Sequence, residues 1–216
     1  MNPTYYSHPA TQQDRWVVEK TNGRREGYFV EVGAHNGIHH SNTLTLETHY
    51  GWNGILIEPD PMLFSQLHHN RPQCMCVKAA VDSEVCEGKE FIFGNSYGGL
   101  VQHMPPQWLE EHRRRETRIG VVPTTTLWQL LDAIGSARIV DFLTLDVEGA
   151  ELPILETFFR ECQEFDHSYV FRCMTVEFRY DSLLLDKLTD RLVSKGYELD
   201  CVRGFDACYQ HKIHGV

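Results

Sequence analysis

The sequence predicts an α/β fold in which a Rossmann-like sheet of about seven mostly parallel strands is flanked by helices. Short apolar runs of strand length alternate with segments of helical periodicity along most of the 216 residues, which is typical of a parallel sheet wrapped by helices. One such run, 28–32, leads into a turn at Gly33, and α/β sheets bind ligands at strand ends of this kind. The length suits one such domain better than two.

The first part of the chain predicts three strands, each close to a helix. We expect helices over 10–20, 42–50 and 62–70 and strands over 28–32, 55–57 and 75–81. In the second helix, Leu44, Leu46 and Tyr50 supply the apolar positions. The second strand is a short apolar run that stops at Glu58 and Pro59. Such short apolar runs bounded by turn residues are typical of buried strands.

Residues 83–123 interrupt this alternation. The segment holds a glycine-rich turn (Gly94, Gly98 and Gly99), two adjacent prolines and a charged run. A long irregular insertion in a compact domain is often a lid or a substrate loop. We therefore expect one domain over 1–216 that carries such a lid or loop.

Regular alternation returns after the insertion. We expect helices over 126–134, 152–162 and 183–195, strands over 142–145 and 174–178, and a closing hairpin of 197–202 and 207–211. These strands bring the total to about seven. Strands that alternate with helices in this way favour a parallel sheet.

The charge balance argues against nucleic acid as a partner. The chain has 30 acidic and 20 basic residues and a formal charge of −10, whereas nucleic-acid binding depends on neutralising phosphates. The basic run 113–115, with Arg118, lies among Glu110, Glu111 and Glu116, which is typical of a solvated helix face.

No apolar stretch approaches the roughly 18 residues of a membrane span. The first 16 residues lack the layout of a signal peptide. We therefore expect a cytoplasmic protein without a membrane partner. The seven cysteines are scattered without a CxxC pair, which favours reduced, buried thiols over a zinc site.

The segment from Phe29 to Gly37, FVEVGAHNG, predicts a nucleoside pocket. Gly33 permits a tight turn and close approach of a ligand, and Gly37 relieves crowding where the next segment packs. Glu58 ends the following strand, where a carboxylate can accept hydrogen bonds from both ribose hydroxyls. The dinucleotide pattern GxGxxG is absent, since His35 holds its middle position. An adenosyl group without phosphates therefore fits better, although an ordinary structural turn remains the alternative.

The sequence resembles the FkbM family of S-adenosylmethionine-dependent methyltransferases. The matching segments are EVGAHNG (31–37), HSNTLTLE (40–47), GWNGILIEPDP (51–61), NRP (70–72) and DFLTLDVEGAELPIL (141–155). The resemblance covers about residues 10–212. It implies a class I methyltransferase fold, S-adenosylmethionine as cofactor and, most often, O-methylation of natural products or sugars. Other members are thought to methylate nitrogen, including nitrogen in peptide side chains.

The resemblance also implies which residues hold the cofactor. The first cofactor loop would be formed by Glu31, Gly33, Ala34, Asn36 and Gly37, with Glu31 near the cationic amino group. Ser41, Asn42 and Thr43 would begin the next helix, where free N–H groups can hold the methionine carboxylate. Glu58, followed by Pro59, would bind the ribose. Ala80, Val81 and Asp82 would lie at the adenine.

The catalytic candidates follow the next two strands. Methyl transfer requires alignment of the acceptor and removal of its proton. Asp146 can orient the cofactor's amino group or the acceptor hydroxyl, Glu148 can act as the base, and Glu177 would face the same cleft. A less favoured alternative is a Mg²⁺ ion on Asp146 and Glu177. Glu151 is interpreted as an acid in the first turn of a helix, where the helix dipole favours it.

The remaining candidates are a histidine and the insertion. The chain has 12 histidines, of which His35, in the cofactor loop, is the candidate nearest the chemistry. The resemblance places a loop of the insertion over the cleft, so Ser96, Tyr97, Gly99 and His103 are expected at the acceptor, with Trp108 as a further wall or as local packing.

These observations predict a methyltransferase that acts on a hydroxyl of a small molecule, natural product or sugar. The alternatives are N-methylation of a peptide or modified natural product and a catalytically inactive scaffold that binds the cofactor. The expected partner is thus a small-molecule or peptide-like acceptor.

Overall fold

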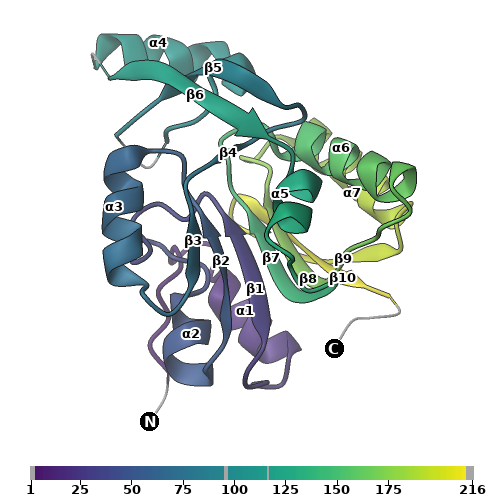
Figure 1. Ribbon diagram of the computed structural model, residues 1–216. Helices are drawn as coiled ribbons and strands as arrows, with labels where there is room; N and C mark the ends of the chain where they lie inside the picture. The colour runs from purple at the N-terminus through teal and green to yellow at the C-terminus, as the bar shows by residue number, and fades with distance from the viewer. Residues whose placement is uncertain (1–2, 95–96, 116, 213–216) are drawn as a thin grey trace.

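The computed structural model describes residues 3–94, 97–115 and 117–212. Its main sheet has seven strands in the order β3-β2-β1-β7-β8-β10-β9, as Figure 1 shows. The strands are β1 (Tyr28–Val32), β2 (Asn53–Ile57), β3 (Met75–Val77), β7 (Ile139–Leu145), β8 (Val170–Glu177), β9 (Tyr197–Arg203) and β10 (Asp206–His211). The first five run parallel, and β10 is antiparallel to both β8 and β9. The predicted fold class, the seven-stranded sheet and the closing hairpin are confirmed.

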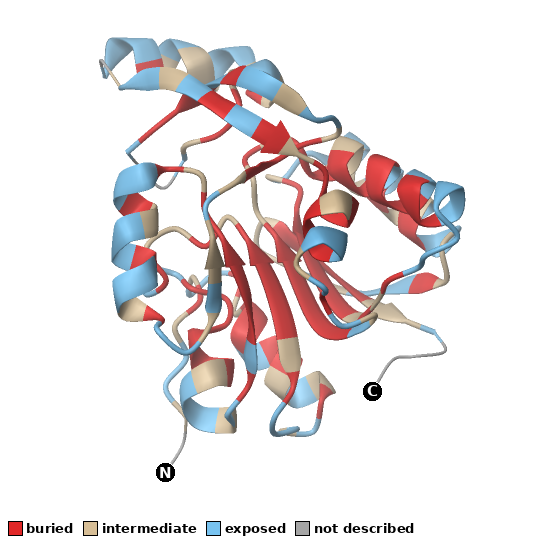
Figure 2. Cartoon of the chain, viewed as in Figure 1, coloured by how far each residue is buried: buried red, intermediate tan, exposed pale blue. Residues whose placement is uncertain are grey.

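Helices cover both faces of this sheet (Figure 1). One face carries α1 (Gln13–Lys20), α2 (Leu44–Tyr50) and α3 (Pro61–Asn70), and the other carries α5 (Leu127–Ala133), α6 (Glu151–Glu164) and α7 (Ser182–Val193). Successive residues of a strand point to opposite faces. Phe29 of β1 accordingly packs in one core with Trp16 of α1, and Val30 packs in the other with Leu131 of α5. Buried residues fill the sheet between the two layers (Figure 2).

Side-chain caps mark where several helices begin. Asp60 accepts hydrogen bonds from the backbone N–H groups of Met62 and Leu63, and proline occupies the first position of α3. Asp181 caps α7 and Thr126 caps α5 in the same way. Such caps satisfy N–H groups that have no partner within the helix. The cap on α3 fixes the chain immediately after Glu58.

The insertion forms a folded lobe with a sheet of its own, so the expectation of an irregular segment over 83–123 is wrong. The lobe sheet has the order β4-β6-β5. It contains β4 (Ala80–Val81), β5 (Cys86–Ile92) and β6 (Ile119–Thr125), with the short 3-10 helix η1 (Val101–His103) and the helix α4 (Pro106–Arg114) between the last two strands. Figure 1 shows this lobe beyond the carboxyl ends of β1 and β2.

The expected strand over 75–81 is divided between the two sheets, which corrects that prediction. Met75–Val77 pair with β2, whereas Ala80 and Val81 pair with Thr124 and Thr125 of the lobe. Apart from Lys78, apolar residues continue through the crossover in the sequence. A hydrophobic pattern therefore does not show where the chain leaves one sheet for the other.

The expected solvated basic face is confirmed. Arg113 and Arg114 in the last turn of α4, and Arg115 directly after it, are exposed, and Arg114 and Arg115 form ion pairs with Glu110 and Glu111. All seven cysteines are free thiols, as expected, but three of them are buried and the other four are half-buried. Within the described parts of the chain, no helix is both long enough and apolar enough to cross a membrane.

Candidate active site

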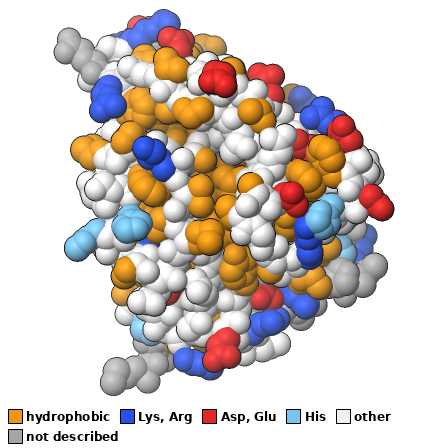
Figure 3. Space-filling model, viewed as in Figure 1, with side chains coloured by type: hydrophobic (Ala, Val, Ile, Leu, Met, Phe, Trp, Pro, Cys, Tyr) orange, Lys and Arg blue, Asp and Glu red, His pale blue; other side chains and the backbone are white. Residues whose placement is uncertain are grey.

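A cavity of about 460 Å³ lies between the main sheet and the lobe, within the size range of small-molecule sites. Its walls come from the carboxyl ends of strands and from the turns that follow them. The lobe contributes Phe91, Ile92, Gly94, Tyr97, Gly98, Gly99, Leu100 and Trp108. Figure 3 shows hydrophobic side chains across the middle of one face of the molecule. The lining has two parts. We call the part near β1 and β2, which includes Gly33, Glu58 and Pro59, the nucleoside half, because the sequence predicts a nucleoside pocket there. We call the part near β7 and β8, which includes Asp146, Glu148 and Glu177, the acidic half.

Glu58 is the polar centre of the nucleoside half. It follows β2, lines the cavity and is 6% exposed. Its two carboxylate oxygens accept hydrogen bonds from the backbone N–H groups of His35 (2.9 Å) and Asp60 (2.8 Å). Burial raises the pKa of Glu58 to about 7. Each oxygen can accept a further hydrogen bond, which suits a ligand with two adjacent hydroxyls.

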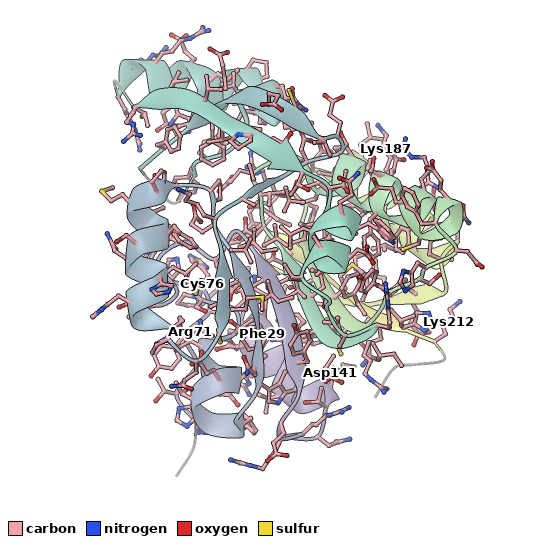
Figure 4. All side chains as sticks on the ribbon, viewed as in Figure 1. Phe29, Arg71, Cys76, Asp141, Lys187 and Lys212 are labelled. Carbon is pink, nitrogen blue, oxygen red and sulfur yellow. The ribbon has the colours of Figure 1, made fainter. Side chains whose placement is uncertain are left out.

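Glu31 and Arg71 form a buried network beneath the first turn. Glu31 accepts hydrogen bonds from the N–H of Asn42 and from the hydroxyls of Ser41 and Thr43. Arg71 is fully buried and donates to both hydroxyls and to the carbonyl of Gly37. In Figure 4, Arg71 lies next to Phe29. Burial raises the pKa of Glu31, although Arg71 opposes this.

Sequence reasoning did not single out Arg71 as a site residue, although it stands in the NRP segment of the resemblance. Glu31, Ser41 and Asn42 line the cavity, but Thr43 does not. The N–H groups of Asn42, Thr43 and Leu44 already donate to side chains of the protein. The expectation of free N–H groups there is therefore wrong, because the network uses them.

The two glycines of the first turn are explained by packing. A Cβ atom on Gly33 would lie 1.9 Å from the backbone oxygen of Asp146, and one on Gly37 would lie 2.6 Å from Leu67. The second contact confirms the expected crowding at Gly37. Gly33 and Ala34 line the cavity, whereas Asn36 and Gly37 do not. The Asn36 side chain instead accepts hydrogen bonds from the backbone N–H groups of Ile38 and His39.

Pro59, expected beside the ribose, lines the cavity; of the residues expected at the adenine, Ala80 and Val81 line it and Asp82 does not. Asp82 is fully buried and binds Lys89 of β5 and His103 of η1. Burial alone would raise the pKa of Asp82, but its hydrogen bonds with His103 and Lys89 lower it to about 2. His103, which was expected at the acceptor, also lies outside the cavity lining.

Three carboxylates converge in the acidic half. Asp146 and Glu148 follow β7, Glu177 ends β8, and one oxygen of each lies within 4.8 Å of the others. Among the described residues that line the cavity, Arg179 is the one arginine or lysine, and its guanidinium pairs with Glu148 and Glu177. The protein's own cation thus partly balances the three carboxylates. The Mg²⁺ alternative at Asp146 and Glu177 stays a prediction.

The acidic half is short of positive charge. Burial raises the pKa of Asp146 to about 6. Burial, together with the nearby carboxylates of Asp146, Glu151 and Asp206, raises the pKa of Glu177 well above its usual range. Burial likewise lowers the pKa of Arg179. A ligand that carries positive charge would therefore be stabilised here.

Glu151 has a larger role than that of an acid at a helix N-terminus. It does stand in the first turn of α6, as expected, but it is 1% exposed. Its carboxylate accepts hydrogen bonds from the N–H groups of Val147 and Gly149. Burial raises its pKa to about 7. Glu151 thereby holds the segment 146–150, which we call the acid loop, against α6.

Aromatic rings surround the outer end of the cavity. Tyr97 and Trp108 lie 5.4 Å apart, and Arg179 lies 5.8 Å from the Trp108 ring. The other rings of the lining are His8, His35, His39, His40, Phe91, Tyr180 and Phe205. Gly99 also lines the cavity, and Ser96 lies outside the described residues.

Sequence reasoning missed Arg179, Tyr180, His8 and Phe205. Arg179 and Tyr180 follow shortly after Glu177 at a strand end, and this position could have identified them as site residues. His8 and Phe205 come from turns far apart in the sequence, 5.2 Å between ring centres. No local pattern marked either of them.

The comparisons with known proteins fit this geometry. The model of the methyltransferase FkbM domain matches residues 31–204. The chain belongs to the FkbM methyltransferase family. Enzymes of this family use S-adenosylmethionine as their methyl donor. No curated protein matches the sequence significantly.

Solved structures share the fold of this FkbM methyltransferase. The METTL16 MTase domain (crystal form 2) has a TM-score of 0.52 and 14% identity, over 92% of this chain and 65% of that one. The FkbM chain thus spans about two thirds of the length of that domain. A human methyltransferase 10 domain containing protein has a TM-score of 0.51 and 16% identity, over 91% and 78%. The N-terminal domain of human METTL16 in complex with SAH has a TM-score of 0.51 and 14% identity, over 94% and 70%.

The residues of the nucleoside half fit an adenosyl group. The buried Glu58 carboxylate keeps acceptor capacity on the cavity side and matches a ribose diol. Pro59, Leu63 and Val81 supply apolar surface beside it. The carboxylates of the acidic half match the positive charge of a sulfonium and an amino group.

Proposed function

We propose that this enzyme methylates a hydroxyl group of a small molecule, such as a natural product or a sugar. The observation that carries the proposal is the convergence of Asp146, Glu148 and Glu177 in the acidic half of the cavity, where Asp146 borders the nucleoside half at Gly33. A hydroxyl must lose its proton when it receives a methyl group, and a carboxylate at the site can accept that proton.

In this proposal, Glu58 binds the ribose, and the backbone at Gly33 and Ala34 borders the methionine part. Pro59, Ala80 and Val81 contact the adenine. Asp146, between the two halves, orients the cofactor's amino group. When bound, S-adenosylmethionine supplies a methyl group on a sulfonium for in-line transfer to the acceptor oxygen.

Glu148 is the proposed proton acceptor. A base must be ionised before the reaction, and the Arg179 guanidinium on Glu148 favours the ionised form. Glu177 is less suited, because burial and its acidic neighbours raise its pKa well above the usual range and so favour its protonated form. Arg179, which donates to both carboxylates, keeps the two glutamates together.

The acceptor is proposed to be a small or peptide-like group rather than a nucleic acid. A cavity of about 460 Å³ is shared by donor and acceptor, and the aromatic rings at its outer end offer flat apolar contact. The formal charge of −10 opposes binding to phosphates.

The test is turnover with a panel of hydroxyl-bearing small molecules, measured as S-adenosylhomocysteine release. Fragmentation mass spectrometry then locates the added methyl. We expect a methyl on oxygen. We also expect Glu148→Gln to lower kcat by at least about 100-fold, as loss of a general base does, with S-adenosylhomocysteine affinity unchanged.

Glu156→Gln is the matched control, because Glu156 is an exposed residue of α6 that pairs with Arg191. It should retain wild-type turnover. A methyl found on nitrogen, or full activity in Glu148→Gln, contradicts the proposal.

A further inference from the structure

Two residues that sequence reasoning placed at the ligands, Asp82 and His103, instead connect the lobe to the acid loop. Asp82 stands where the chain crosses from the main sheet to the lobe sheet, and its N–H donates to the carbonyl of Thr125 (2.9 Å). Its carboxylate accepts hydrogen bonds from Lys89 (2.5 Å) and from Gln102 (2.9 Å). Nε2 of His103 lies 2.8 Å from the same carboxylate.

An ionised carboxylate only accepts hydrogen bonds, so Nε2 of His103 carries the hydrogen in this contact. Asp82 is fully buried and His103 is partly exposed. The pair therefore anchors η1 to the crossover. It also fixes the turn 99–103, whose residues Gly99 and Leu100 line the cavity beside the acid loop.

This turn meets the acid loop backbone to backbone, through a glycine on each side. A Cβ atom on Gly149 would lie 2.5 Å from the carbonyl oxygen of His103. A Cβ atom on Gly99 would lie 3.0 Å from Cβ of Glu148 and 3.2 Å from the oxygen of Val147. The two segments are therefore packed too closely for a side chain at either glycine. Glu148 itself has a φ of 65°, an uncommon backbone conformation for a residue other than glycine.

We propose that His103, anchored by Asp82, and Gly99 are positioning residues that set the place of Glu148 in the active site. Glu151 holds the acid loop from one side, and the turn 99–103 holds it from the other. The inference rests on the proposed role of Glu148 for its catalytic consequence. The mechanical link between lobe and acid loop stands on the contacts alone.

The first test is Gly99→Ala. The φ of Gly99 lies outside the left-handed region, so alanine adds no strain of that kind; its new Cβ presses on Glu148 and Val147 of the acid loop and on the flexible end of the Met104 side chain. We expect kcat with the acceptor found in the panel to fall by about tenfold or more, because small displacements of a catalytic group are costly. The affinity for S-adenosylhomocysteine should stay within about twofold, since Gly99 contacts the acid loop rather than the nucleoside half.

Gly88→Ala is the matched control. Gly88 also lies in the lobe, and its new Cβ would meet only the side chain of Val121, which is 68% exposed and free to turn away. We expect wild-type turnover. Equal turnover in Gly99→Ala and the wild type overturns the positioning role of Gly99.

The second test needs no acceptor and uses hydrogen–deuterium exchange of peptides that cover the acid loop. We expect His103→Ala to raise exchange at Val147 and Gly149 by about tenfold, because local opening frees amide groups. His103→Gln, whose amide can still donate to Asp82, should restore most of the protection. Peptides of β1 and β2 should not change.

The outcomes separate this inference from the proposed function. Unchanged hydrogen–deuterium exchange of the acid loop in His103→Ala, or no recovery of its protection in His103→Gln, overturns the proposed link between the lobe and the acid loop. A large rise in acceptor KM with unchanged kcat in His103→Ala also overturns it, because it means direct contact with the acceptor. If Glu148→Gln keeps full activity while exchange responds as expected, the function proposed for Glu148 fails and the link stands.

Discussion

Glu58 shows how one buried side chain can be prepared for a ligand. Its carboxylate is held by the N–H groups of His35 and Asp60, and these bonds fix its direction. They do not fully compensate for burial, since the pKa of Glu58 is still raised to about 7. A ribose diol would add two hydrogen bonds to the same carboxylate and favour its ionised form.

The first prediction concerns this residue. Glu58→Gln removes the charge and one acceptor, and hydrogen bonds to a charged group contribute about 1.5–3 kcal/mol each. We therefore expect the affinity for S-adenosylhomocysteine, measured by calorimetry, to fall by about 10-fold to 100-fold. Glu90→Gln, an exposed position on β5, is the control and should bind normally. Unchanged affinity in Glu58→Gln rejects the ribose role.

At the scale of elements, the junction of β1 and β7 depends on one glycine. The N–H of Asp146 donates to the carbonyl of Val32, so the two strand ends are tied directly in front of the cavity. The carbonyl oxygen of Asp146 occupies the space beside Gly33, which has a φ of 91°. The glycine thus serves both the turn and the close contact of the strands.

Gly33→Ala should therefore lower the free energy of unfolding by more than the cost of a positive φ for alanine. A non-glycine residue in this backbone region costs about 1–2 kcal/mol, and a Cβ at 1.9 Å from Asp146 must also displace backbone. We expect urea denaturation to show a loss of more than about 3 kcal/mol. Gly135→Ala provides the comparison, since Gly135 has a φ of 65° and open space around it. Equal losses in the two variants contradict the packing argument.

Sequence patterns predicted most elements of the main sheet because their strands are buried on both faces. The run YFVEV and the end of β7 read as strands for this reason. The lobe escaped prediction because β5 reads CEGKEFI, with charged residues on its exposed face. Its pairing partner β6 follows about 30 residues later, across α4. Strand pairing between segments this far apart along the chain leaves no pattern in the local sequence.

Strand ends were also the most predictable part of the site. Glu58, Asp146 and Glu177 were found because the carboxyl ends of parallel strands meet at one edge. Arg179 and His8 were not found, since their positions depend on turns and on the N-terminal segment. The family resemblance implied that Asp82 lies at the adenine, but its carboxylate binds Lys89 and His103 instead.

At the scale of the whole molecule, buried acids make stability depend on pH. Asp146, Glu151 and Glu58 have pKa values raised to about 6, 7 and 7, and those of Glu177 and Asp206 are raised well above their usual range. Each folded group binds its proton more tightly than in the unfolded chain. Its stabilisation is therefore fully present below the unfolded pKa and is lost as the pH rises through the folded value.

The ligand-free protein should accordingly lose stability from about pH 5 to pH 8. Asp82 has the opposite effect on stability, because its pKa is lowered to about 2. Its contribution to the stability of the fold is lost only in strong acid. We expect the Tm to fall by several degrees between pH 5 and pH 8, since about 1 kcal/mol corresponds to about 2–4 °C for a chain of this size. Glu177→Gln, which imitates the protonated acid, should reduce the fall. A Tm that rises over this range contradicts the charge assignment.

The most direct test of the whole account is a crystal structure of the protein with S-adenosylhomocysteine. The account predicts the ribose hydroxyls on the carboxylate of Glu58, the adenine beside Pro59 and Val81, and the sulfur facing Asp146 and Glu148. A cofactor bound outside this cavity, or a ribose without contact to Glu58, would contradict it.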